Sequence, residues 1–335
     1  MQRIDAASIA AYLRARGWFR DDQVLRVTEL DGGVSNTVIR VELARGPVVV
    51  KQPLERLKVA AEWRSDPARG ANEAEGLRVA AALLPAGSAP PLRQYDPADR
   101  VVVMDAAPPG AVPWKSRLLA GHVEPALAQD AGRILAALHG GSWAQSAWAD
   151  RFLASFRYFE ELRLGPYFEY LLPRHPEVAP ALRAVLTALR SDRRCLVHGD
   201  FSPKNLLVTQ PDRLLLIDWE VVHYGNPVFD CGFLLTHLAL KAVHVGGDDP
   251  APFFGLMETF LNTYAGALGA RAAPFADVAP VLGGLMLARV DGKSPVEYLT
   301  PAEQDRVRRW ALAVLAEPPR DFAGFRASWE EARVS

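Results

Sequence analysis

The sequence predicts an α+β protein of two lobes, a small N-terminal antiparallel-sheet lobe (residues 1–105) and a larger, mainly helical C-terminal lobe (residues 106–335). Three observations support this prediction. Short apolar or alternating segments typical of strands dominate the first 105 residues, whereas apolar residues at helical spacing dominate the rest. The Pro/Gly-rich stretch AAPPGAVP (106–113) separates the two patterns. A chain of 335 residues also exceeds the usual size of one domain.

The N-terminal lobe is expected to begin with a helix over 5–18, where Ile9, Leu13 and Trp18 have helical spacing. Three strands joined by hairpins should follow, and the third should end on Lys51. A second helix and two further strands complete the lobe. The expected strands are VLRVTEL (24–30), NTVIRVEL (36–43), GPVVVK (46–51), PPLRQYD (90–96) and RVVVMD (100–105), with the second helix over about 68–84.

The sequence of the C-terminal lobe predicts a series of helices interrupted by one pair of strands. The strand pair is NLLV (205–208) and RLLLID (213–218) around a turn. The helices are expected at about 124–139, 149–162, 176–190, 229–243, 252–267, 275–290 and 301–316.

The amino-acid composition argues against two classes of partner. Half of the residues are apolar, 23% are charged, and the net charge is -1 without a long basic block. We therefore expect neither nucleic acid nor a membrane as partner. The first residues lack a continuous apolar region, so the prediction is a cytoplasmic protein. Cys195 and Cys231 have no metal-like or redox-like spacing and are expected in the core. The sequence is compatible with a monomer or a homodimer.

The loop LVHGDFSPKNLLV (196–208) carries the strongest functional pattern. His198, Asp200 and Asn205 have the H-x-D-x4-N spacing of a phosphoryl-transfer catalytic loop. We therefore expect Asp200 to aim an acceptor hydroxyl and to take up its proton late in the reaction. Lys204 either neutralises charge on the transferring phosphoryl group or is a solvated lysine. The structural alternative for the whole loop is a capped turn.

Two carboxylates after the next apolar run extend this pattern. Asp218 ends LLLID, and a carboxylate at the end of a buried strand needs a cation, for which Mg²⁺ is the natural partner. Asn205 would supply a second, neutral oxygen ligand. Glu220 is either a further metal ligand or a solvated loop residue.

The N-terminal lobe offers candidates for ATP binding. In ELDGGVSNTVIRV (29–41), Gly32 and Gly33 can leave backbone N–H groups facing phosphate oxygens, although Gly-Gly in a hairpin is usually only a turn. Ser35 and Asn36 could add donors. Lys51 comes at the end of an apolar strand, which is a suitable position for an ammonium group that binds phosphate. The alternative interpretation is an ordinary lysine at the end of a strand.

Such a lysine needs a carboxylate to hold it, and the next helix offers Glu73 and Glu75. Glu73 shares the inward apolar face of that helix, whereas Glu75 points roughly opposite, so Glu73 is the predicted partner. The strand VVVMD would supply adenine contacts through backbone groups near its end, with Met104 either lining the site or filling the core. The residues concerned are Met104, Asp105 and Ala106.

These segments resemble the aminoglycoside phosphotransferase and choline kinase superfamily, two-lobed relatives of protein kinases. The resemblance runs through DGGVSN, VVVKQ, NEAEGL, VHGDFSPKN, LIDWE and NPVFDCGFLL. It implies a protein-kinase-like fold, and it implies that Asp230 is a structural anchor for the catalytic loop. It assigns the roles described above to Lys51, Glu73, Asp200, Asn205 and Asp218.

Several stretches look like the methylthioribose kinase branch, notably KQPLERLKVAAEWRSDPARGANEAE (51–75) and LMLARVDGKSPVEYL (285–299). The second is similar to the segment where that branch has an arginine pair facing its sugar substrate. Here Ala288 occupies the first position of the pair and only Arg289 remains. Arg289, Asp291 and Lys293 are therefore the candidate acceptor residues, although Asp291 and Lys293 are equally compatible with a solvated helix end.

The resemblance implies an ATP- and Mg²⁺-dependent kinase that phosphorylates a hydroxyl of a sugar or sugar-like small molecule. One alternative keeps the enzyme but makes the acceptor an aminoglycoside or similar antibiotic. Polycations favour a carboxylate-rich cleft, whereas acidic and basic residues are nearly balanced beyond residue 240. The other alternative is a nucleotide-binding regulator without turnover, yet the lysine, the catalytic carboxylate and the metal ligands are all present.

Overall fold

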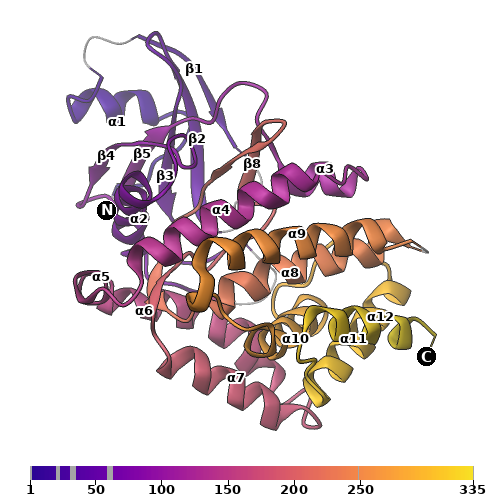
Figure 1. Ribbon diagram of the computed structural model, residues 1–335. Helices are drawn as coiled ribbons and strands as arrows, with labels where there is room; N and C mark the ends of the chain where they lie inside the picture. The colour runs from indigo at the N-terminus through magenta and orange to yellow at the C-terminus, as the bar shows by residue number, and fades with distance from the viewer. Residues whose placement is uncertain (1, 20–22, 31–34, 59–62, 248, 335) are drawn as a thin grey trace.

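A five-stranded antiparallel sheet forms the N-terminal lobe of the computed structural model (Figure 1). The structure describes residues 2–19, 23–30, 35–58, 63–247 and 249–334. The strand order is β1-β2-β3-β5-β4. The strands are β1 (Val24–Glu29), β2 (Asn36–Leu43), β3 (Val48–Pro53), β4 (Leu92–Asp96) and β5 (Val101–Asp105).

The two faces of this sheet bury different neighbours. Helix α1 (Ile9–Ala15) joins Val101 and Val103 of β5 in one apolar cluster. Val102 and Met104, which alternate with them, belong to the larger core that includes α2 (Arg69–Leu83). In β3, Val50 faces the first cluster, so the next residue, Lys51, faces the side of α2.

The C-terminal lobe is built mainly from helices, with one three-stranded and one two-stranded sheet of short strands. The helices are α3 (Trp114–Leu119), α4 (Pro125–Ser142), α5 (Ser146–Arg151), η1 (Leu153–Ser155), α6 (Phe156–Phe159), η2 (Glu160–Glu169), α7 (Ala179–Ser191), α8 (Val228–Lys241), η3 (Ala242–Gly246), α9 (Ala251–Leu268), η4 (Gly269–Arg271), α10 (Phe275–Asp291), α11 (Pro301–Ala316) and α12 (Phe322–Val334). The strands are β6 (Val112–Pro113), β7 (Cys195–Val197), β8 (Leu206–Gln210), β9 (Arg213–Leu216) and β10 (His223–Gly225).

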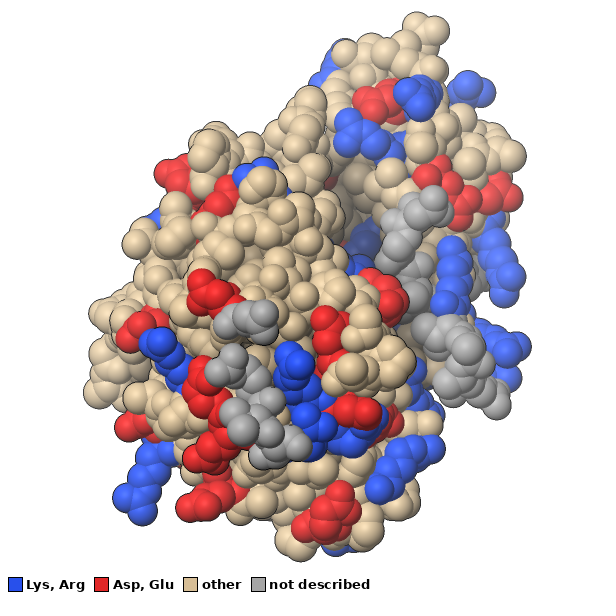
Figure 2. Space-filling view, turned by 90° about the vertical axis from the view of Figure 1, so that its right-hand side faces the viewer, with Lys and Arg blue, Asp and Glu red and all other residues tan. Residues whose placement is uncertain are grey.

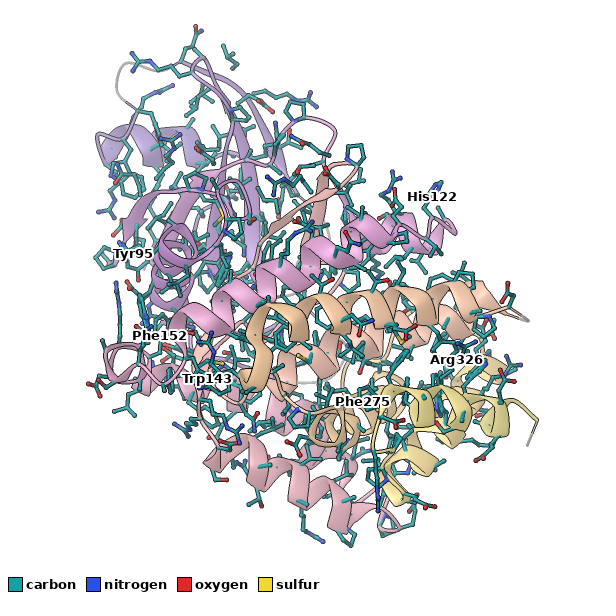
Figure 3. All side chains as sticks on the ribbon, viewed as in Figure 1. Tyr95, His122, Trp143, Phe152, Phe275 and Arg326 are labelled. Atoms are coloured by element: carbon teal, nitrogen blue, oxygen red, sulfur yellow. The ribbon has the colours of Figure 1, made fainter. Side chains whose placement is uncertain are left out.

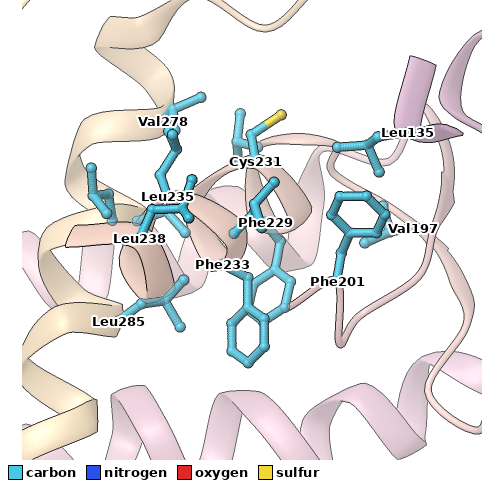
Figure 4. Close-up of a cluster of buried hydrophobic side chains, with 14 of the residues drawn as sticks. Leu135, Val197, Phe201, Phe229, Cys231, Phe233, Leu235, Leu238, Val278 and Leu285 are labelled. Atoms are coloured by element: carbon cyan, nitrogen blue, oxygen red, sulfur yellow. The ribbon is translucent and has the colours of Figure 1, made fainter. Parts of the chain in front are cut away.

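Helix α8 is the centre of this lobe. All of its residues are buried, and aromatic and aliphatic side chains surround it (Figure 4). The stretch Val228–Gly246 is long and apolar enough to cross a membrane, but 89% of it is buried inside the protein, as in a core helix. Side chains likewise fill the space between the other elements (Figure 3).

The predicted α+β class is confirmed, and most predicted elements lie where the sequence places them. The helix expected over 149–162 is not continuous, because α5, η1 and α6 are followed by the π-helix η2. Pro166 lies inside η2 and lacks a backbone N–H, which accounts for the irregular turns. Strand β3 continues through Pro53, because its pairing with β2 extends to that residue, so Lys51 lies within the strand and not at its end.

Helices α3 and α12 and the short strands β6, β7 and β10 have no counterpart among the predicted elements. Each of these strands has only two or three residues, too few to show a period. The strand pairings nevertheless matter for function. The pairing of β7 with β10, and of β8 with β6 and β9, fixes both ends of the loop 198–205.

Candidate active site

Lys51 joins the two lobes at the centre of the predicted site. Its Nζ donates a hydrogen bond to Glu73 Oε1 at 3.0 Å and to Asp218 Oδ1 at 2.6 Å. All three side chains are largely buried. Glu75 lies on the other side of α2 and pairs with Arg78 at 2.9 Å. The structure therefore brings Lys51, Glu73 and Asp218 together, although Asp218 is 167 residues from Lys51.

The charges at this junction are tightly coupled. Burial opposes the charge of Lys51, but Asp218 and Glu73 outweigh burial and raise the lysine pKa. Burial also works against ionisation of Asp218, yet Lys51 and Lys204 together hold its pKa below the usual range. Burial dominates at Glu73 and raises its pKa, and Glu73 Oε2 has no hydrogen-bond partner among the described residues. Asp218 is thus the carboxylate that keeps its charge at this junction.

The backbone of Asp218 is held in a conformation that most side chains avoid. Its φ is +74°, a left-handed value that costs on the order of 1–3 kcal/mol for a residue other than glycine. Such strain persists only where the surroundings enforce it. The N–H of the preceding Ile217 donates to the carbonyl of Asn205 at 3.0 Å, so this turn is tied to the end of the predicted catalytic loop.

The start of the catalytic loop is anchored by a buried carboxylate. Asp230, fully buried at the start of α8, accepts hydrogen bonds from the backbone N–H groups of His198 at 2.7 Å and Gly199 at 2.9 Å. His139 lies 3.3 Å from the same carboxylate. Gly199 has φ +76°, and a Cβ there would lie 2.9 Å from the carbonyl oxygen of Val221. These contacts agree with the anchoring role that the resemblance implies for Asp230.

Both oxygens of the Asp200 carboxylate are oriented by neighbours. Arg163 Nη2 lies 2.9 Å from Oδ1, and Asn205 Nδ2 donates to Oδ2 at 2.7 Å. Arg163 also donates through Nε to the carbonyl of Gly199 at 2.7 Å. Because Asn205 uses its amide nitrogen here, its side-chain oxygen is left for another partner.

Glu220 is held by the N-terminal lobe. Its Oε2 accepts hydrogen bonds from Arg69 Nε at 2.9 Å and from Asn36 Nδ2 at 3.0 Å. Arg69 is fully buried and also donates to the carbonyls of Ser35 at 2.5 Å and Leu54 at 2.8 Å. Only Oε1 of Glu220 therefore remains for a metal.

The predicted phosphate-binding hairpin is described only in part. Gly32 and Gly33 lie outside the described residues. Asn36 donates to Ser35 Oγ at 3.0 Å as well as to Glu220, so its amide hydrogens point into the protein and not toward a nucleotide. The expectation that Asn36 adds a free donor is therefore not met by this arrangement.

Two backbone N–H groups in the segment predicted to contact adenine already donate hydrogen bonds within the protein. Asp105 N–H donates to the carbonyl of Pro91 at 3.0 Å, and Ala106 N–H donates to that of Pro47 at 3.1 Å. Adenine contacts at these residues would therefore have to use carbonyl oxygens. Met104 is buried in the large core, which is one of the two roles predicted for it.

The three predicted acceptor residues lie in different surroundings. Arg289 is half-buried, and its Nη1 contacts Tyr167 Oη at 3.3 Å and Ser294 Oγ at 3.2 Å. Asp291 instead accepts two hydrogen bonds from Arg308, at 2.8 and 2.7 Å. The Nζ of Lys293 lies 5.6 Å from the centre of the Tyr170 ring. Asp291 is thus occupied by a structural ion pair.

Sequence reasoning missed Arg163 and Arg69, which orient Asp200 and Glu220. Neither arginine belongs to a recognisable motif, and their partners are distant in the chain. Asn72 was also missed: its Nδ2 donates to the carbonyls of Glu220 and Val222, each at 2.8 Å, and ties α2 to the segment after Asp218. Two signals pointed to Asn72: it lies next to Glu73 in α2, and it is the first residue of the resembling segment NEAEGL.

The donor set at the junction fits a hard cation. Asp218 offers a charged carboxylate and Asn205 a free amide oxygen, which suits Mg²⁺. Within the described ranges, no group of three or more His, Cys, Asp and Glu side chains could hold a metal by itself. A magnesium site completed by phosphates and water needs only one or two protein carboxylates.

The sequence also matches a known protein family. A family model described as "Phosphotransferase enzyme family" matches residues 26–272, more than half of the chain. This match confirms the predicted superfamily.

Solved structures share the fold. The chain is similar to amicoumacin kinase hAmiN in complex with AMP-PNP, Ca²⁺ and Ami, with a TM-score of 0.57 and 17% identity over 89% of this chain and 90% of that one. It is also similar to macrolide 2'-phosphotransferase MphH from Brachybacterium faecium, with a TM-score of 0.50 and 19% identity over 97% of each chain. A choline/ethanolamine kinase family protein from Mesorhizobium loti matches with a TM-score of 0.49 and 21% identity over 98% of this chain and 92% of that one.

Proposed function

We propose, from the premise that the chain belongs to the phosphotransferase enzyme family, that it transfers the γ-phosphate of ATP to a hydroxyl of a sugar or sugar-like small molecule. As a member of that family it is an ATP-dependent phosphotransferase acting on hydroxyl groups. The observation that supports phosphoryl transfer at this site is the contact of Lys51 with Asp218 across the lobes at 2.6 Å. We also propose a cytoplasmic location, where ATP is supplied.

Lys51 and Glu73 form the nucleotide-binding half of the proposed site. The Lys51 ammonium would hold the α- and β-phosphates, and Glu73 would keep that ammonium in place. Pairing with Asp218 at 2.6 Å keeps the lysine charged when no phosphate is near. Bound Mg²⁺ would supply positive charge that neutralises the phosphates. Asp218 and Asn205 would hold it, with Glu220 Oε1 as a third candidate ligand.

Asp200 is the proposed acceptor-positioning carboxylate. Arg163 and Asn205 fix the orientation of both its oxygens, so the carboxylate can accept a hydrogen bond from the acceptor hydroxyl in one direction. It would receive the hydroxyl proton as the bond between the acceptor oxygen and the γ-phosphorus forms and the bond from that phosphorus to the β-phosphate oxygen breaks, which releases ADP. Lys204 is exposed and near enough to Asp218 to lower its pKa, which supports a role in neutralising the phosphoryl group.

The test is release of ADP from ATP and Mg²⁺ by the purified protein, across a panel of neutral sugars, sugar acids, sugar phosphates and aminoglycosides. Asp200→Asn should lower kcat by at least about 100-fold with any accepted substrate. Asp212→Asn, an exposed aspartate in the β8–β9 turn, is the matched control and should retain the parental rate. Parental activity in Asp200→Asn would refute the role of Asp200.

Two further outcomes would replace the proposal. If the protein binds ATP with Mg²⁺ but releases no ADP with any acceptor, it is a nucleotide-binding regulator. If aminoglycosides alone support turnover, it is an antibiotic kinase. Lys51→Ala should lower kcat/KM for ATP, with the exposed Lys58→Ala as its control.

A further inference from the structure

A lysine is buried beneath the acceptor side of the site without an acidic partner. Lys241, the last residue of α8, is fully buried. Its Nζ donates to the carbonyl of His237 at 3.1 Å and lies 3.5 Å from Tyr298 Oη. Within the described ranges no carboxylate forms an ion pair with it. A buried charge without a counter-charge is costly, so its retention requires an explanation.

One further cation, Lys115, lies over the ring of Tyr298. The Nζ atoms of Lys241 and Lys115 lie 5.2 and 5.6 Å from the centre of the Tyr298 ring. Burial, together with repulsion from Lys115 and Arg289, lowers the pKa of Lys241 to about 7. Glu297, which pairs with Lys115, is the carboxylate that partly offsets this repulsion at Lys241.

Arg289 also lacks an acidic partner in the described part of the chain. Its Nη1 contacts the neutral oxygens of Tyr167 and Ser294, and its buried Nε has no hydrogen-bond partner there. We define Lys115, Lys241 and Arg289 as the basic cluster. With Glu297 included, it carries a net positive charge of two when Lys241 is protonated.

The basic cluster lies beside the predicted catalytic carboxylate. Lys115 N–H donates to the carbonyl of Pro203, within the catalytic loop, at 2.9 Å. Arg289 and Arg163 lie 5.8 and 5.9 Å from the centre of the same Tyr167 ring. Arg163 in turn contacts Asp200. Figure 2 shows the hollow between the lobes, with lysine or arginine atoms visible inside it.

We propose that the basic cluster binds an anionic group of the acceptor, so that the enzyme phosphorylates a hydroxyl compound that carries a carboxylate or a phosphate. This inference rests on the proposed function, because Asp200 defines where the acceptor hydroxyl lies. Arg289 and Lys115 are partly exposed and would contact the anion, whereas Lys241 acts from beneath through Tyr298 and its charge. An anionic acceptor would supply the missing counter-charge, and a cationic acceptor would be repelled.

The experiment varies the charge of the acceptor within two series of compounds, each on its own carbon skeleton. Initial rates of ADP release would be compared for glucosamine, glucose, glucuronate and glucose 6-phosphate, and for glycerol, glycerate and glycerol 3-phosphate. We expect kcat/KM at least ten-fold higher for an anionic member than for its neutral parent, and lowest for glucosamine. Comparing kcat/KM for glucuronate and glycerate with kcat/KM for the two phosphate compounds shows whether the site prefers a carboxylate or a phosphate. The preference should weaken as salt is raised.

Variants link this preference to the basic cluster. Arg289→Gln and Lys241→Met should each reduce the anionic-to-neutral ratio of kcat/KM by about ten-fold or more, whereas Arg183→Gln, on the exposed side of α7, should leave the ratio unchanged. Calorimetric binding of glucuronate and glucose 6-phosphate, with AMP-PNP and Mg²⁺ present, gives a readout that needs no turnover. The same two variants should weaken it.

The outcomes separate the inference from the proposed function. Asp200-dependent turnover that favours glucose or glucosamine would overturn the anionic acceptor while leaving the kinase proposal intact. Absence of both turnover and binding for every anionic compound would also overturn it. Binding of glucuronate or glucose 6-phosphate that depends on Arg289, without ADP release, would support the anion site and refute the kinase proposal.

Discussion

Replacing Lys241 with methionine should stabilise the protein, and the gain should depend on pH. Methionine is similarly long and unbranched, so it can fill the space beneath Tyr298 without a charge. Burial, with Lys115 and Arg289, lowers the lysine pKa from 10.5 to about 7 in the folded protein. The folded state therefore disfavours the protonated lysine that the unfolded chain carries at neutral pH.

The magnitude follows from proton linkage. Each pKa unit corresponds to about 1.4 kcal/mol, so the shift costs the parent on the order of 5 kcal/mol below pH 7, where Lys241 is protonated in both states. Between about pH 7 and 10.5 the unfolded state binds more protons than the folded state, so the stability of the parent rises with pH. At pH 9 the remaining cost is about 2 kcal/mol, and it vanishes above pH 10.5.

The titratable groups near Lys241 should not produce the same dependence of stability on pH. Burial and nearby cations hold the pKa of His237 well below its ordinary value. Burial raises the pKa of Tyr298, so its hydroxyl stays neutral in this range. Burial opposes ionisation of Glu297, but Lys115 outweighs it and keeps the carboxylate pKa low. Among these four groups, only Lys241 should change charge between pH 6 and 9.

The assay is urea unfolding of the parent and Lys241→Met at pH 6 and pH 9, followed by circular dichroism. The stability gain of the variant should be about 3 kcal/mol larger at pH 6 than at pH 9. Packing differences between lysine and methionine do not depend on pH and cancel in this comparison. A gain that is equal at the two pH values, or larger at pH 9, would refute the reasoning.

Three other substitutions test the site. Asp230→Ala removes the acceptor of two buried backbone N–H groups in the catalytic loop, so urea unfolding should show a loss of about 3 kcal/mol or more; a loss below about 1 kcal/mol would contradict the anchoring role. Gly76→Ala would place a Cβ 2.6 Å from Trp219 Cβ, and a decrease of about 1–4 °C in Tm is expected from a cost of about 1–3 kcal/mol; an unchanged Tm would mean that α2 moves freely. Arg163→Gln should lower kcat about 10- to 100-fold with little change in KM for ATP, because Asp200 loses an orienting partner; a change confined to KM for ATP would argue against that role.

The local parts of the site could be predicted from the sequence. His198, Asp200 and Asn205 lie in one loop, so their spacing alone suggests that they act together. The choice of Glu73 over Glu75 needed only the helical period, because that period decides which residues share a face. The contact of Glu73 with Lys51 at 3.0 Å agrees with that prediction, although the nucleotide-binding role of the pair stays a prediction.

The fold class, the order of the main elements and the residues of the catalytic loop follow from the amino-acid sequence, because periodicity and short spacings are local properties of a chain. Which buried charges have partners depends on contacts between distant parts of the chain. Arg69 reaches Glu220 across 151 positions, and no local pattern encodes that contact. The sequence pattern around Lys241 predicts only a polar residue at the end of an apolar helix. Its burial, with no carboxylate paired to it among the described residues, depends on how α10 and Tyr298 pack against α8, because the cost of a charge is set by its surroundings in space.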